Sequence, residues 1–270
     1  MRFWWFNRYI LTTLILLAAV CLPIQASTVD EVIERGELRV AISAFEPWVI
    51  KDEKGNLSGF EIDVAKKVAE DMGVKAVFTL VPWEEIISIL ENGNVDVIIA
   101  GMSITPQRAL HVDFSVPYAD SGVTIATNTH LTKHIKSLKQ LDQADIKIAT
   151  VSDTVSDKLV ASMFSNAQQQ QFKTPEDVES ALNNGKVHAF VGSDPLPKFM
   201  ALRHPNSIDA PLSKPLLAYK AAMAVKKGDQ ALLNYLNAWI TARSADAWLS
   251  SKHKYWFDSL KWRPSKQTDK

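Results

Sequence analysis

Residues 60–81 read FEIDVAKKVAEDMGVKAVFTLV, and this stretch decides the fold. Its first part carries an apolar residue at every fourth position from Phe60 to Met72, which predicts an amphipathic helix. Gly73 follows directly, where helices commonly end in a left-handed conformation that glycine adopts without strain. Residues 74–81 are rich in β-branched and aromatic side chains and predict a strand. The stretch therefore predicts a helix that leads into a sheet.

The same alternation continues on both sides of this stretch. Further strands are predicted at residues 38–42, 95–100, 146–151 and 187–191, and further helices at residues 82–90 and 154–164. Thr174 and Pro175 suit the N-cap and first position of another helix. The glutamine run before them predicts a weak strand or loop at a sheet edge. Alternating strands and helices favour α/β units with parallel sheets.

Two such α/β units follow one another, and the chain crosses between them twice. We expect it to leave the first unit near residue 121 and to return near residue 218, which makes a two-segment hinge. The predicted first lobe then comprises residues 27–121 and 218–270. The second lobe comprises residues 122–217.

Residues 1–26 have the pattern of a secretory signal peptide. A positive start precedes an apolar run at residues 10–20, and Ala26 offers a small residue for cleavage. The alternative is an uncleaved anchor, because no charge occurs from Tyr9 to Val29. The strongly apolar part is about a dozen residues, shorter than the ~20 that a spanning helix needs. We therefore expect cleavage after Ala26 and export to the periplasm.

Composition excludes several function classes. The only cysteine, Cys21, lies in the leader, so the mature chain has neither a disulfide nor thiol chemistry. The whole chain has 30 basic and 30 acidic side chains, and loss of Arg2 and Arg8 with the leader leaves a net charge of −2. This balance argues against nucleic acid as a partner. His130 and His134 lie in a polar segment without a partner cysteine or acid cluster, so we predict no metal and no cofactor.

Short motifs follow one another along the first lobe, and together they resemble a known family. They are GELRV (36–40), FEPW (45–48), GNLSGFEIDVA (55–65), PWE (82–84), GNVDVI (93–98), GMSITPQR (101–108) and DFSVPY (113–118). In this order they resemble the family-3 extracellular solute-binding proteins of polar amino-acid ABC importers. The resemblance covers about residues 30–260 and is looser in the second lobe. It implies a type II periplasmic binding protein fold, an amino-acid ligand and an importer permease as partner; we expect a monomer.

The segment around Arg108 predicts an anion clamp. Thr105 suits a helix N-cap and Pro106 the first turn, where free N–H groups and the helix dipole favour an anion. The planar fork of Arg108 pairs a carboxylate through two hydrogen bonds. The segment also follows the strand predicted at residues 95–100, and open α/β sheets bind ligands at the carboxyl ends of their strands. From the residues alone, Arg108 could equally be a surface arginine.

The resemblance assigns ligand contacts to this segment and to nearby aromatic residues. It implies that Arg108 holds the α-carboxylate and that Gly101 and Ser103 contact the α-amino and carboxylate groups. Met102, between them, is counted among the ligand-binding residues. It also implies that Phe45 covers the ligand side chain. Trp48 and Trp83 are either further contacts or core aromatics.

In the second lobe, the resemblance implies ligand contacts from Thr154, Val155 and an aspartate after the strand at residues 187–191. Ser193 and Asp194 compete for the place of that aspartate, and we favour Asp194 as the partner of an ammonium group. Asp153 stands where the family has glycine, so its carboxylate must turn outward or the ligand must bind differently. Thr154 also predicts a helix N-cap.

These features predict a periplasmic protein that captures an amino acid, with polar or cationic ones favoured, for an ABC importer. It is predicted not to be an enzyme. One alternative is a dehydratase on the same scaffold, similar to cyclohexadienyl dehydratases, although no second acid follows Asp194 in the stretch ending at Lys198. Another alternative is a free sensory receptor.

Overall fold

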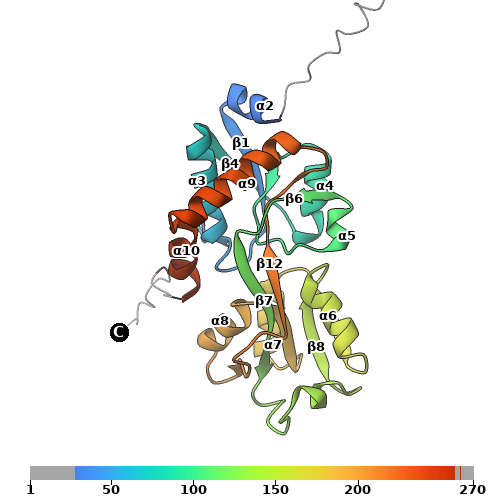
Figure 1. The fold of residues 1–270 in the computed structure, drawn as a ribbon. Helices are drawn as coiled ribbons and strands as arrows, with labels where there is room; N and C mark the ends of the chain where they lie inside the picture. The colour runs from blue at the N-terminus through green and yellow to red at the C-terminus, as the bar shows by residue number, and fades with distance from the viewer. Residues whose placement is uncertain (1–27, 259–261, 263–270) are drawn as a thin grey trace, which may run out of the picture.

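Two lobes, each built on its own β-sheet, make up the protein in the computed structural model, which describes residues 28–258 and 262. Figure 1 shows the lobes one above the other, with both ends of the described chain in the upper lobe. The predicted leader with Cys21, and most of the C-terminal tail, lie outside the described residues. Within the described part of the chain, every helix is too short or too polar to cross a membrane.

The first lobe contains a sheet with the strand order β4-β1-β5-β13-β6. Its strands are β1 (Glu37–Ile42), β4 (Lys75–Leu80), β5 (Val97–Ile98), β6 (Val112–Phe114) and β13 (Ala224–Lys226). Strand β1 runs parallel to β4 and β5, whereas β13 is antiparallel to β5 and β6. Its helices are α2 (Thr28–Arg35), α3 (Phe60–Met72), α4 (Ile86–Glu91), α5 (Pro106–Ala109), α9 (Gln230–Ala245) and α10 (Trp248–His253). Smaller elements are the hairpin β2 (Ile50–Lys51) and β3 (Leu57–Ser58), η1 (Trp83–Glu85) and η3 (Lys254–Asp258).

The second lobe contains a sheet with the strand order β11-β7-β10-β8-β9, and β12 pairs with β7. Its strands are β7 (Ala119–Asn128), β8 (Lys147–Val151), β9 (Gln168–Phe172), β10 (Ala189–Ser193), β11 (Ile208–Asp209) and β12 (Leu217–Ala221). Its helices are η2 (Leu138–Leu141), α6 (Val155–Met163), α7 (Pro175–Asn183) and α8 (Leu196–Arg203). The glutamine-rich β9 is an edge strand, as predicted.

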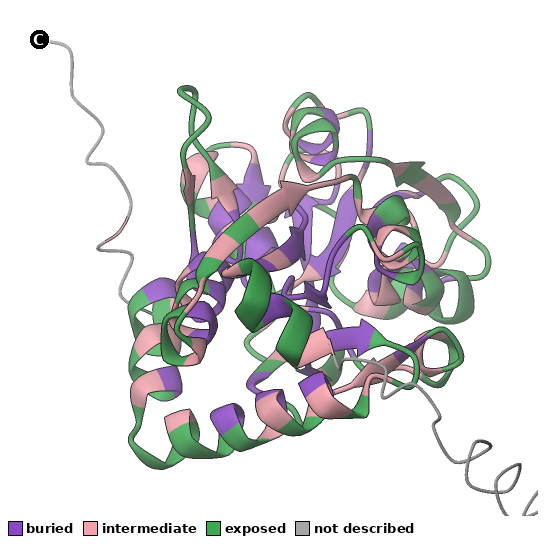
Figure 2. Ribbon diagram, turned by 90° about the horizontal axis from the view of Figure 1, so that it is seen from above, coloured by how far each residue is buried: buried purple, intermediate pink, exposed green. Residues whose placement is uncertain are grey.

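Helix α3 has the bounds predicted from the sequence. Its side chains Phe60, Val64 and Val68 are fully buried in the core of the first lobe. Gly73 ends the helix with a φ of 79°, and its N–H donates to the carbonyl of Glu70. Figure 2 shows the same pattern throughout, with buried residues along the strands and exposed residues on the outer helix faces.

Strand β5 is shorter than the strand predicted at residues 95–100. Regular pairing covers only Val97 and Ile98, because the neighbouring β13 is itself short and meets β5 only there. The full predicted segment is nevertheless buried, as expected of a strand covered on both faces. Buried Asp96 within it accepts hydrogen bonds from Arg35 and Arg39.

The lobes are joined by two antiparallel strands, β7 and β12, which pair from Ala119–Ala221 to Val123–Leu217. Strand β7 follows β6 of the first sheet, and β12 leads into β13 of that sheet. The chain therefore crosses between the lobes twice, and the predicted two-lobed α/β fold with a two-segment hinge is confirmed. The boundaries assigned to each lobe remain expectations.

Candidate functional site

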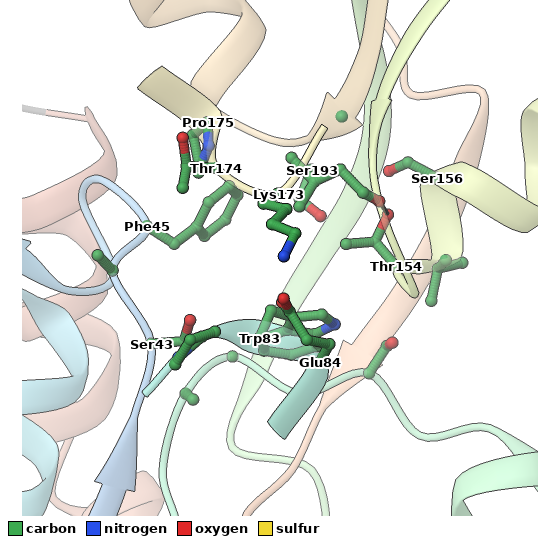
Figure 3. Close-up of a pocket in the computed structure, with 18 of the residues that line it drawn as sticks. Ser43, Phe45, Trp83, Glu84, Thr154, Ser156, Lys173, Thr174, Pro175 and Ser193 are labelled. Carbon is green, nitrogen blue, oxygen red and sulfur yellow. Dashed lines mark hydrogen bonds between the residues drawn. The ribbon is translucent and has the colours of Figure 1, made fainter. Parts of the chain in front are cut away.

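A cavity of about 480 Å³ lies between the two lobes. Its walls come from segments that follow the carboxyl ends of β1, β4 and β5 in the first lobe and of β8, β9 and β10 in the second. Both sets of strands are parallel, so their carboxyl ends meet at one edge of each sheet, where α/β folds bind ligands. Figure 3 shows side chains from both lobes converging on this space.

Arg108 is held at this cavity by the short helix α5. Thr105 caps the helix, with its Oγ1 accepting the Arg108 N–H at 3.2 Å, as predicted. The Nη1 group donates to the Ser103 carbonyl at 3.1 Å and to Ser103 Oγ at 2.6 Å. The Nη2 group donates across the cleft to the carbonyl of Asp153 at 3.2 Å. These acceptors are neutral, and no carboxylate forms an ion pair with Arg108 within the described chain.

Trp83 reinforces this contact between the lobes. Its ring lies beneath the Arg108 guanidinium, 5.2 Å from the ring centroid, which suits a cation–π interaction. Its Nε1 also donates to the Asp153 carbonyl, at 3.2 Å. One carbonyl of the second lobe is therefore shared by two side chains of the first. Trp83 lines the cavity, as does Phe45.

Asp153 adopts the left-handed conformation expected at a position where the family has glycine. Its φ is 59°, which aspartate tolerates better than most residues, and the residue is exposed. Thr154 and Val155 follow at the cavity wall. The Thr154 hydroxyl accepts the Asp157 N–H at 3.2 Å and donates to the Val151 carbonyl at 2.7 Å, so the predicted N-cap is confirmed. The single hydroxyl proton of Thr154 is therefore already donated to the Val151 carbonyl.

Trp48 is a core residue and does not line the cavity. It is 1% exposed and packs edge-on against Phe60 and Phe257, with centroids 5.7 and 4.7 Å away. The tight loop closed by backbone hydrogen bonds between Phe45 and Val49 turns the indole inward. The structure therefore corrects the reading of Trp48 as a ligand contact.

Met102 is likewise a core residue between two cavity residues. Gly101 and Ser103 line the cavity, whereas Met102 is fully buried in an apolar cluster of the first lobe. Its carbonyl accepts the N–H of Ala222 at 3.0 Å, so its backbone is also engaged in the fold.

Ser193, and not Asp194, lies at the cavity wall after β10. Asp194 is exposed, and its N–H donates to the carbonyl of Gly122 in β7 at 2.8 Å. Of the two residues that the sequence left in competition, Ser193 is the one that lines the cavity. The charge of Asp194 nevertheless acts on the cavity residue Tyr219, and its ammonium role stays a prediction.

Several cavity residues were missed by the sequence analysis. Ser43, Lys173, Phe190 and Tyr219 line the wall together with residues of the predicted set. Burial raises the pKa of Tyr219, while hydrogen bonds with Ser121 and Ser193 and the charge of Arg108 oppose that rise. Ser43 and Lys173 each follow the last residue of a strand. The rule that α/β folds bind ligands at the carboxyl ends of their strands could therefore have predicted both residues.

Comparison with known proteins identifies the family. The model of the bacterial extracellular solute-binding proteins, family 3, matches residues 38–259. The chain belongs to this family. The cyclohexadienyl dehydratase of Pseudomonas aeruginosa is 24% identical over 250 residues, which cover 92% of each protein.

Solved structures of family-3 relatives share the two-lobed fold. One is the ancestral amino acid-binding protein AncCDT-1, described as a precursor of cyclohexadienyl dehydratase. It is 32% identical, with a TM-score of 0.78 over 86% of this chain and 100% of that one. Another is a putative ABC transporter binding component from Wolinella succinogenes, complexed with lysine. It is 32% identical, with a TM-score of 0.79 over 84% of this chain and 98% of that one.

Proposed function

We propose that this protein captures an amino acid in the periplasm by closing its two lobes and delivers it to the permease of an ABC importer. The observation that carries this proposal is the state of Arg108. Its guanidinium faces the cavity, is partly buried, which lowers its pKa, and contacts only neutral acceptors in the described chain. A partly desolvated cation without an anionic partner favours a ligand carboxylate at this place.

The contact between Arg108 and Asp153 supports closure around the ligand. Arg108 belongs to the first lobe and the Asp153 carbonyl to the second, so the guanidinium lies where both lobes meet. A carboxylate bound there touches both walls of the cavity only when the lobes are together. Such a ligand stabilises the closed state in proportion to its additional contacts in that state.

The remaining polar lining around Arg108 supplies neutral hydrogen-bonding groups. Ser103 Oγ lies next to the guanidinium, and Ser193 and Tyr219 line the same cavity. An α-ammonium group would therefore be met by hydroxyl and carbonyl oxygens at this end. This arrangement favours a ligand that is recognised mainly through the charge of its carboxylate.

Titration calorimetry on protein refolded from denaturant, which removes carried-over ligand, tests the proposal. Arg108→Ala should weaken binding of an amino-acid ligand by at least a hundredfold, since breaking a buried charge pair costs about 3–5 kcal/mol. Arg108→Lys should recover part of the loss, because it restores the charge without the planar fork. Unchanged affinity in both variants, with unchanged thermal unfolding of the empty protein, would overturn the assignment.

Dehydratase activity is a second candidate, favoured by the likeness to the Pseudomonas aeruginosa enzyme along nearly the whole chain. The carboxylates that line the cavity are Glu84, Glu85 and Glu176, and all three residues are exposed. The fully buried carboxyl of Glu61 lies outside the cavity wall. A general acid benefits from a desolvated position, so this arrangement favours binding over catalysis. Turnover of prephenate or arogenate by the purified protein would establish the enzyme instead.

A further inference from the structure

Lys173 brings a second positive charge into the cavity. It follows the last residue of β9, Phe172, and β9 runs parallel to β8. The carboxyl ends of these strands meet at one edge, which places Lys173 on the same wall as Thr154. Figure 3 shows its side chain extending into the space, with the ammonium group toward Trp83 and Glu84 on the opposite wall.

This ammonium group has no partner within the chain. The structure gives Lys173 neither a hydrogen bond nor an ion pair among residues 28–258 and 262. Glu84 of the first lobe faces it, but the two side chains do not come within ion-pair distance. The cavity therefore presents two cations that are not neutralised by direct contact, Arg108 and Lys173, one from each lobe.

The two cations have different surroundings. Arg108 is fixed by Ser103 and Asp153 at the point where the lobes touch. Lys173 instead extends from the end of β9, beside the aromatic ring of Phe45 in the view of Figure 3. Phe45 and Phe190 also line the cavity. A ligand whose α-carboxylate is held by Arg108 would have its side chain within the same cavity as Lys173.

We infer that Lys173 sets the specificity of the site by selecting an amino acid that carries a second carboxylate. Lys173 is exposed, so water screens its charge in part, but a cationic side chain that extends toward it would still meet a like charge. An acidic side chain gains a charge-assisted hydrogen bond from the same ammonium group. The inference rests on the proposed function, because it takes Arg108 as the α-carboxylate site. It differs from the sequence-based preference for a polar or cationic ligand, which stays a prediction.

Glu84 opposes this selection in part. Glu84, like Glu85 and Glu176, is exposed, so water screens its charge more than a buried position would. In the empty cavity it faces the Lys173 ammonium and attracts it toward the first lobe. An acidic ligand competes with Glu84 for that group. Glu84→Gln should therefore tighten binding of an acidic ligand.

Calorimetry with matched ligands tests the inference. Ligand-free protein is titrated with glutamate, 2-aminoadipate, glutamine and lysine. We expect the dicarboxylic amino acids to bind about two- to fivefold tighter than glutamine and lysine, because Lys173 is exposed and its charge is partly screened. Lys173→Met should remove most of this preference, and Lys173→Glu should reverse it toward lysine. Lys186→Met serves as the control, because Lys186 is an exposed lysine of the second lobe outside the cavity and should leave every affinity unchanged.

Two results would overturn the inference in distinguishable ways. If lysine binds tightest to the wild type, or if Lys173→Met weakens glutamate and glutamine equally, the selection is wrong while amino-acid capture stands. If no amino acid binds the wild type, the proposed function fails as well. The thermal unfolding of each empty variant shows whether the fold is intact, and the charge-reversed Lys173→Glu gives a gain of lysine binding that misfolding cannot produce.

Discussion

Glu46 of the first lobe forms an ion pair with Arg203 of the second, beside the cavity residue Phe45. Arg203 also pairs within its own lobe with Glu179, at 2.6 Å, and that carboxylate is shared with His204 at 2.9 Å. Glu179 therefore holds the Arg203 guanidinium in place within the second lobe, independently of Glu46. The pair with Glu46 exists only when the lobes are together, so it belongs to the closed state.

Glu46→Gln should therefore weaken ligand binding. The two partners are 25% and 26% exposed, so the pair is partly screened and contributes about 1 kcal/mol at most. We expect an affinity about two- to fivefold lower, together with a larger radius of gyration of the liganded protein in X-ray scattering. Glu53→Gln is the control, because Glu53 is an exposed glutamate of the first lobe outside the cavity, and it should leave the affinity unchanged. Equal affinities for Glu46→Gln and the wild type would show that the pair does not favour closure.

Gly101 forms the cavity floor directly above the Trp48 indole. Its φ is +62°, and a Cβ at this position would lie 2.9 Å from Trp48 Cε3. Gly101→Ala should therefore lower both the free energy of unfolding and the affinity for ligand, because the indole or the floor must shift. Gly93→Ala is a matched control, since Gly93 has a φ of +74° with no atom near the added Cβ.

Gly93→Ala introduces only the strain of a non-glycine residue at positive φ, which costs about 1–2 kcal/mol. Gly101→Ala should exceed that loss in urea unfolding, and only Gly101→Ala should alter ligand affinity in calorimetry. If the cavity floor accommodates alanine at position 101, the two variants should have equal free energies of unfolding, and both should bind ligand with unchanged affinity. That result would mean that Trp48 does not position Gly101.

Local patterns in the sequence predicted helices α3 and α6 and the start of α7, because their causes are local, whereas the helix predicted at residues 82–90 is divided into η1 and α4. The spacing in α3, the glycine after it and the caps Thr105 and Thr154 depend on neighbours within one turn. The cap and the strand end placed the segment around Arg108, but from the residues alone Arg108 could equally have been a surface arginine, and its role came from the family resemblance. The two-lobed fold followed from the order of these elements.

Other features of the site depend on contacts between distant segments. The choice between Ser193 and Asp194 depends on the register of β10 against β7, where Ser193 pairs with Val123. The inward turn of Trp48 depends on a core completed by Phe257, far along the chain. Lys173 lies at the cavity only because β9 pairs beside β8. Residue type and spacing do not determine these relationships.

A buried carboxyl group lies behind the cavity floor and should give the protein a distinctive pH dependence. Glu61 is fully buried, and Tyr118 Oη donates to its two oxygens at 2.7 and 2.8 Å. The Gly101 N–H in turn donates to Tyr118 Oη at 3.3 Å. Burial raises the pKa of Glu61 from 4.5 to about 8, and the hydrogen bonds from Tyr118 and Gly101 partly oppose this rise.

The sign of the effect follows from proton binding. Between pH 4.5 and about 8, the folded protein holds a proton on Glu61 that the unfolded chain has released. The free energy of unfolding therefore falls as pH rises through this window, and the loss is complete above about pH 8. Glu61→Gln keeps a neutral, hydrogen-bonding side chain of similar size and should not show this loss. Glu70→Gln on the same helix is the control, because Glu70 is 71% exposed.

Urea unfolding of the three proteins from pH 5 to pH 9 tests this prediction. The difference between Glu61→Gln and wild type should shift in favour of the variant by a few kcal/mol across that range, since one pKa unit corresponds to about 1.4 kcal/mol. Other titrating groups are common to both proteins and cancel in the difference. Parallel curves for Glu61→Gln and wild type would mean that Glu61 titrates near its ordinary pKa, and that water reaches the carboxyl group behind Tyr118.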